Sequence, residues 1–150
     1  MCDVSRLQKF VQLPVPERML LVRALLMLAV VRLGLWLLPL ITLKGLLSEL
    51  ITVLSDSGKQ REFSVEHRIW AVQAASRCVP QATCLTQALA AQVLLGFAGI
   101  PACLRIGVSK EAPQQLEAHA WLESDGQILL GGSDADQKYI PMLVLNSWED

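Results

Sequence analysis

Residues 83–108 read TCLTQALAAQVLLGFAGIPACLRIGV, and the change of pattern that decides the fold lies inside this stretch. In its first part apolar residues recur at helical spacing, with Thr83 as an N-cap and Gly96 or Gly99 as the end of the helix. The apolar period then changes to two, which predicts a strand over residues 102–108. A helix followed at once by a strand favours a small sheet packed on a central helix.

The residues that follow predict the rest of that sheet. LEAHAWLE alternates as a strand, and SDGQ followed by ILLGG predicts a hairpin around Asp125-Gly126. A two-residue turn at that position would place His119 opposite Gly132. YIPMLVL predicts a last strand. The sheet is therefore expected to be antiparallel.

The residues upstream predict helices. A near-continuous apolar run favours a helix over 15–31, and a second is expected over 40–54. The polar stretch SDSGKQREF is interpreted as a linker, and Ser64 as the cap of the next helix. The chain is predicted to be an α+β protein with a hydrophobic helical segment over 1–54 and a core domain over 64–150.

The composition narrows the possible partners. The 150 residues carry a net charge of -1, which gives no broad basic field, so duplex nucleic acid is not expected as a partner. Apolar residues make up 53% and the mean hydropathy is +0.41, an excess concentrated over 19–43. The first residues lack the pattern of a secretory signal. We therefore expect a cytoplasmic protein, or one peripheral at the inner membrane.

The apolar segment 19–43 has about the length of a bilayer crossing but is interrupted by Arg23 and Arg32. An arginine at the bilayer centre costs roughly 2.5–3.5 kcal/mol on insertion scales. Gly34 and Pro39 also predict a break. Two interpretations stay open, a pair of buried helices and a hydrophobic docking surface for a partner or a membrane.

Cys84 and His119 are the candidate catalytic pair. Cys84 begins the most regular helix, where unpaired backbone N–H groups and the helix dipole favour a thiolate and can stabilise an oxyanion. His119 lies in the middle of a strand between two alanines. A cysteine at a helix start with a histidine on a later strand is typical of papain-type acyl transfer. The other histidine, His67, is interpreted as a solvated surface residue.

The remaining cysteines point to no metal site. They lie at positions 2, 78 and 103, and no C-x-x-C pair exists, so neither zinc nor a disulfide framework is expected. Cys78 and Cys103 are interpreted as packing residues. No cofactor is predicted.

The run SRCVPQATCLTQALAAQVLLGFAGIPACLRIGVSKEAPQQLEAHAWLESDGQILLGG resembles the transglutaminase-like cysteine proteases of lasso-peptide biosynthesis. The motifs are Cys-Leu at the start of a helix, a Gly-Ile turn, an Arg-Ile-Gly-Val strand, and His-Ala-Trp-Leu-Glu before an acidic hairpin tip. The resemblance covers about residues 75–142. It implies a papain/transglutaminase-like core in which a helix bears the cysteine and a small antiparallel sheet bears the histidine.

The resemblance also implies a Cys-His-Asp peptidase that removes the leader of a precursor peptide. The freed amine would be joined to a side-chain carboxylate by a separate ATP-dependent cyclase. The short apolar N-terminal half leaves no room for a leader-recognition domain, so a separate recognition protein is implied. Expected partners are this protein, the precursor and the cyclase.

The acid of the triad is the least defined member. The strand after the histidine contains no acid, and hairpin pairing places Asp134 on the face of His119, within diagonal reach. Asp134 is the first choice and Asp136 the second, while Asp125 is interpreted as a turn residue. A Cys-His dyad oriented by a backbone or amide group stays open.

Two other functions fit the same residues. An acyltransferase on the same scaffold would pass the acyl group to an amine instead of water. A non-catalytic interaction module would use the apolar surface to recruit partners and keep Cys84 as a core thiol.

Overall fold

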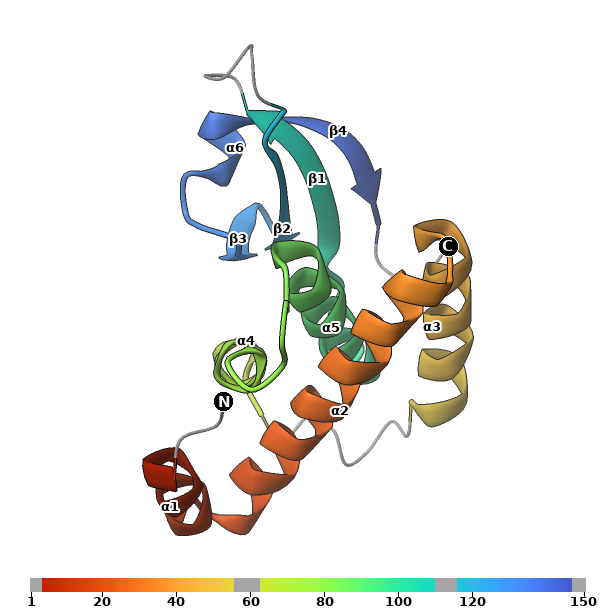
Figure 1. Cartoon of the computed structure of the whole chain (residues 1–150). Coiled ribbons are helices and arrows are strands. Elements are labelled where there is room, and N and C mark those ends of the chain that lie inside the picture. The colour runs from red at the N-terminus through yellow and green to blue at the C-terminus, as the bar shows by residue number, and fades with distance from the viewer. Residues whose placement is uncertain (1–3, 56–62, 110–115, 147–150) are drawn as a thin grey trace.

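The structure is a computed structural model of the chain, and it describes residues 4–55, 63–109 and 116–146 (Figure 1). The helices are α1 (Val4–Gln12), α2 (Val15–Leu37), α3 (Leu40–Leu54), α4 (Val65–Ser76), α5 (Cys84–Phe97) and the short α6 (Ala135–Lys138). The strands are β1 (Cys103–Ser109), β2 (Ala118–Ser124), β3 (Gln127–Leu130) and β4 (Tyr139–Leu145). The predicted mixture of helices and a small antiparallel sheet is confirmed.

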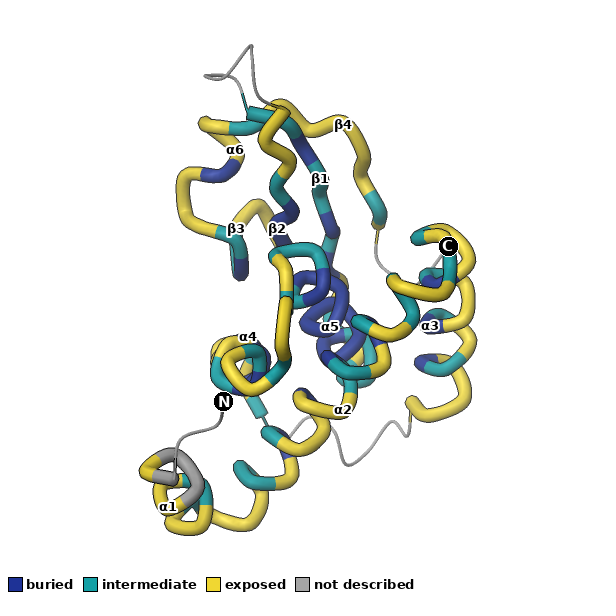
Figure 2. The backbone as a smooth tube through the Cα atoms, viewed as in Figure 1, coloured by how far each residue is buried: buried dark blue, intermediate teal, exposed yellow. Residues whose placement is uncertain are grey.

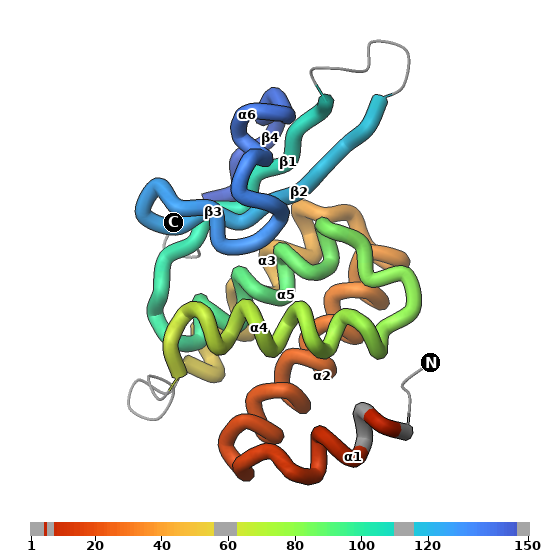
Figure 3. The backbone as a smooth tube through the Cα atoms, turned by 90° about the vertical axis from the view of Figure 1, so that its left-hand side faces the viewer, coloured from red at the N-terminus to blue at the C-terminus, as the bar shows by residue number. Residues whose placement is uncertain are grey.

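The four strands form one antiparallel sheet in the order β3-β2-β1-β4. Helix α5 packs against β2 and β1, and α2 packs against α4 and α5. Figure 3 shows the sheet at one end of the molecule, α4 and α5 below it, and α2 farther from the strands. Helix α5 is therefore the central element of the fold, as residues 83–108 predict.

Helices α4 and α5 begin at capping side chains. The Ser64 hydroxyl accepts a hydrogen bond from the backbone N–H of His67, and Thr83 does the same for Thr86, each at 3.3 Å. Such caps satisfy N–H groups that have no acceptor within the helix. Both helices begin where the sequence predicts.

Helix α2 ends later than the predicted range 15–31, but the break before α3 lies between Gly34 and Pro39, as predicted. Helix α2 continues to Leu37, because Gly34 remains helical and lies against Leu43 of α3. A Cβ added to Gly34 would come within 2.4 Å of a Leu43 methyl group. The glycine thus allows α2 and α3 to approach closely, and Pro39 precedes the first residue of α3.

The residue pairing predicted for the β2–β3 hairpin is correct at the turn and wrong beyond it. Ser124 pairs with Gln127, and Asp125 and Gly126 adopt φ of 50° and 76°. The register then shifts, so that Leu122 pairs with Leu130 instead of the residue before it. Such a bulge changes which residues lie opposite each other. The expected pairing of His119 with Gly132 does not form, because β3 ends at Leu130.

Candidate active site

Cys84 is the first residue of α5 and a half-buried free thiol. The N–H groups in the first turn of a helix point along its axis and carry the positive end of the helix dipole. Because α5 packs against β2, Cys84 lies on an element that contacts the strand of His119. Among the described residues, no hydrogen bond joins the Cys84 thiol to the His119 ring.

His119 is the second residue of β2 and lies opposite Gly107 of β1. Its Nε2 lies 2.6 Å from the carbonyl oxygen of Gly131. A carbonyl oxygen only accepts hydrogen bonds, so Nε2 must be the donor. In a neutral ring, this assignment leaves the lone pair on Nδ1. The ring is thereby set to accept a proton at Nδ1.

A close passage of the chain over β2 brings this carbonyl to the histidine. Gly131 follows β3 with φ of 111°, a conformation that L side chains rarely adopt. A Cβ on Gly131 would lie 2.5 Å from the Cβ of Trp121 and 2.9 Å from its Cα. Only glycine therefore fits here.

Two aromatic rings complete the surroundings of His119. The ring of Tyr139, the first residue of β4, stacks on the histidine with centroids 4.8 Å apart. Trp121, which is 1% exposed, lies with its ring centroid 6.5 Å from that of His119. Sequence reasoning missed Tyr139, and the available signal was its position as the single tyrosine of the chain at the start of a predicted strand.

The candidate acids lie in and near α6. The Asp134 carboxylate is paired with Lys138 at 2.7 Å, and both side chains are more than half exposed. The hydrogen bond from Lys138 holds the pKa of Asp134 below its ordinary value. Asp136 is an exposed residue of α6, and Asp125 lies at the exposed hairpin tip. The hydrogen bond that the structure gives to the His119 ring runs from Nε2–H to a backbone carbonyl, not to any of these carboxylates.

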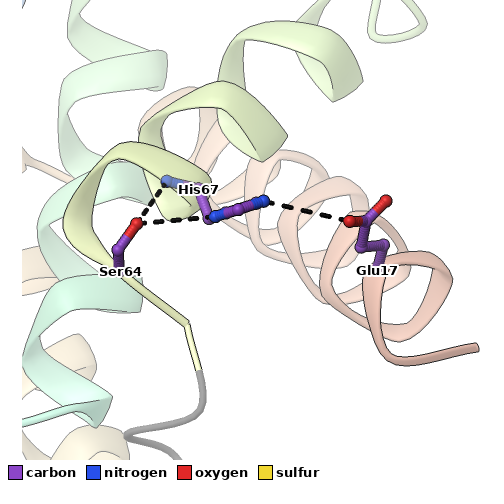
Figure 4. A network of polar contacts seen from close by, with 3 residues as sticks. All are labelled: Glu17, Ser64 and His67. Carbon is purple, nitrogen blue, oxygen red and sulfur yellow. Dashed lines mark hydrogen bonds and ion pairs between the residues drawn. The ribbon is translucent and has the colours of Figure 1, made fainter. Parts of the chain in front are cut away.

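His67 belongs to a different surface (Figure 4). Its side chain is 52% exposed, its Nε2 lies 3.9 Å from a Glu17 oxygen, and its Nδ1 lies 3.5 Å from the Ser64 hydroxyl. These neighbours connect α4 to the start of α2. Nothing in this arrangement involves α5 or β2.

The other described cysteines have distinct surroundings. The Cys103 thiol donates to the Asn146 side-chain oxygen at 3.2 Å and is a free thiol. Cys78 is disulfide-bonded, so its interpretation as a packing residue is wrong. It lies in an exposed turn after α4, where a side chain has little core to pack against. Cys84 and Cys103 are the free thiols of the described residues.

Gln92 joins α5 to the sheet, although it lies among apolar residues of the helix. It is fully buried in α5, and its Nε2 donates to the carbonyls of Ala102, Leu145 and Asn146 at 2.8, 3.3 and 3.3 Å. These carbonyls lie just before β1 and at the end of β4. The available signal was an amide within the otherwise apolar run from Ala88 to Leu95.

The chain belongs to the transglutaminase-like superfamily, whose family model matches residues 25–144. Members of this superfamily are typically cysteine-dependent enzymes, and the scaffold is consistent with a cysteine protease or an acyltransferase. The match begins within α2, ends in β4 and includes both Cys84 and His119. Comparisons with curated proteins and with solved structures gave no significant match.

Proposed function

We propose that this protein is a cysteine peptidase in which Cys84 is the nucleophile and His119 the general base. The observation that carries the proposal is the 2.6 Å contact between His119 Nε2 and the Gly131 carbonyl. It supports a ring whose Nδ1 is free to take the thiol proton. The position of Cys84 at the start of α5 supports its role as the nucleophile.

The proposed reaction has two steps. His119 Nδ1 takes the Cys84 thiol proton as the sulfur attacks the carbonyl carbon of the scissile amide, and N–H groups of the α5 first turn stabilise the oxyanion. The C–N bond then breaks, and the proton passes from His119 Nδ1 to the leaving amine. A thioester then joins the acyl part to Cys84. Water, deprotonated by His119, attacks that thioester and releases a carboxylate and the thiol.

The Gly131 carbonyl takes the orienting role in this proposal. Asp134 stays a prediction for that role, with Asp136 next, but the pairing of Asp134 with Lys138 favours the backbone group. The carbonyl would also stabilise the imidazolium that forms when Nδ1 accepts a proton.

The proposed substrate is the leader-bearing precursor of a ribosomally made lasso peptide. This part rests on the motif resemblance around Cys84 and His119. A separate leader-recognition protein would raise the local concentration of the cleavage site, and an ATP-dependent cyclase would consume the freed amine. Full-rate processing of free precursor without the recognition protein would contradict this partner assignment.

The activity test is incubation of the protein with candidate precursor and recognition protein, followed by mass spectrometry. We expect leader and core products with wild type and with Cys103→Ala, and none with Cys84→Ala or His119→Ala. A leader that ends in an amide would instead identify an acyltransferase. Intact precursor with the wild-type protein and a cognate recognition protein would contradict peptidase activity.

A pair of glycine variants tests the orienting role. Gly131→Ala introduces the contact with Trp121, whereas Gly132→Ala, also at positive φ, meets only an Asp134 oxygen at 3.4 Å. We expect Gly131→Ala to lose much more activity. Nitrogen NMR of His119 should show the Nε2–H form in wild type and in Gly132→Ala. An Nδ1–H ring in the wild type would rule out the orienting role of the carbonyl.

A further inference from the structure

The outward side of α2 is apolar although it is exposed. Eleven residues of α2 are exposed, and Arg23 is the only charged one among them. We define the outer face of α2 by six side chains whose residues are 43 to 75% exposed: Val22, Leu26, Val30, Leu33, Trp36 and Leu37. The opposite side of the helix packs against α4 and α5.

This face extends along more than four turns of helix. At 100° per residue, Val22, Leu26 and Leu33 point roughly away from the buried residues Leu20 and Val31. A contiguous apolar stripe of this length on an exposed helix marks a surface that is covered in use.

The distribution of charge indicates what covers it. The first 54 residues carry six Lys or Arg against three Asp or Glu, a net charge of +3. The remaining 96 residues carry seven against eleven, a net charge of -4. Arg23, which is exposed, lies three residues before Leu26 at the border of the outer face. A cationic region with an apolar helix face complements an anionic lipid surface.

The placement of α2 suits a surface position. Helices α4 and α5 pack between α2 and the strands, as Figures 1 and 3 show. A bilayer against the outer face would therefore contact the side of the helical layer remote from the sheet. Trp36, 75% exposed near the end of α2, is a residue type enriched at membrane interfaces.

Contacts of α2 within the protein argue for resting on the membrane instead of crossing it. By length and composition alone α2 could span a bilayer, a test that buried helices of soluble proteins also pass. However, Arg32 donates to the Gln81 side-chain oxygen at 2.6 Å, and Leu20, Ala24 and Leu28 are at most 2% exposed. Insertion of α2 would break these contacts and place two arginines in hydrocarbon.

We infer that the outer face of α2 is a docking surface for an anionic lipid bilayer, on which the protein rests peripherally. This inference is independent of the proposed peptidase activity. Binding would combine burial of the apolar face in the interface with attraction of the cationic N-terminal region to lipid headgroups.

Vesicle co-sedimentation of the full chain tests the inference. The probes are vesicles of phosphatidylglycerol mixed with phosphatidylcholine and vesicles of phosphatidylcholine alone. We expect binding to the anionic vesicles, weaker binding to the neutral ones, and a decrease with added salt. Leu26→Glu/Leu33→Glu should lower the partition coefficient at least about tenfold, because two charges enter the buried face.

Met142→Glu is the matched control, because Met142 is 71% exposed on β4, outside the outer face. It should bind like wild type, and circular dichroism should show that all variants are folded. Three results would overturn the inference: no binding of wild type to anionic vesicles, equal binding of the double variant, or resistance of membrane-bound protein to alkaline extraction. A dimer broken by the double variant, without vesicle binding, would assign the face to a second copy.

Discussion

Helices α5 and α2 are both strongly apolar, yet α5 is much more buried than α2 (Figure 2). Helix α5 has no charged residue and nine buried residues, whereas α2 has four charged residues and four buried ones. The difference follows from their layers, because α5 lies between the sheet and other helices while α2 has neighbours on one side. Apolar composition therefore does not determine burial. Helix α5 therefore forms part of the hydrophobic core, whereas α2 keeps an exposed apolar surface.

The largest effect on activity is expected at the N-terminal end of α5, where Cys84 is partly exposed. Cys84→Ala removes the proposed nucleophile, and the rate of leader removal should fall by about 10⁴-fold or more. Cys84 is half-buried, so the variant should remain folded. Mass spectrometry of the products measures the rate, and circular dichroism the fold.

Cys103→Ala is the control for this prediction, because Cys103 is the other free thiol of the described residues. It should retain near wild-type activity. Cleavage by Cys84→Ala at near wild-type rate, together with loss in Cys103→Ala, would move the nucleophile to β1.

The difference in burial between the two helices predicts that leucine-to-alanine variants in α5 and in α2 will differ in stability. Leu89 in α5 is fully buried and Leu33 in α2 is 58% exposed. Leu89→Ala should lower the free energy of unfolding by about 2–5 kcal/mol, because it leaves a cavity. Leu33→Ala should change it by about 0.5 kcal/mol or less. Urea unfolding of both variants measures the difference, and equal losses would show that α2 is covered in solution.

A smaller effect is expected from the amide that joins α5 to the sheet. Gln92→Leu removes the donor to three backbone carbonyls and should cost roughly 1–3 kcal/mol of unfolding free energy. Gln87→Leu is the control on the same helix, since Gln87 donates to the one carbonyl of Ala82 at 3.1 Å. A larger loss for Gln87→Leu would assign the anchoring role to the first turns of α5.

The hairpin shows where sequence reasoning succeeds and where it stops. The turn at Asp125-Gly126 was predictable because its residue types specify positive φ locally. Beyond the turn the register shifts between Leu122 and Glu123, and Gly131 then passes close to Trp121. No local residue pattern specifies either feature, so the pairing away from the turn could not be predicted.

The candidate active site likewise has parts that the sequence predicts and parts that it does not. Cys84 and His119 could be proposed from the sequence because each has a chemically informative side chain at a helix start or in a strand. The Gly131 carbonyl has no side-chain signal, and the stacking of Tyr139 on His119 depends on how β4 returns to the sheet. Hairpin pairing suggested Asp134 as the acid but could not predict the ion pair between Asp134 and Lys138.

The smallest effect is expected from Asp134→Asn, which separates a backbone orienter from a carboxylate one. In serine proteases, replacing the orienting aspartate by asparagine lowers the rate roughly 10⁴-fold. We expect near wild-type cleavage here, because the Asp134 carboxylate is bound to Lys138. The pKa of Asp134 is lowered by the Lys138 hydrogen bond. The pair therefore stabilises α6 above the unfolded-state pKa, and that contribution is lost as the pH falls through the folded-state pKa. Rate measurements at neutral pH decide the role: a loss of several orders of magnitude would make Asp134 the third catalytic group.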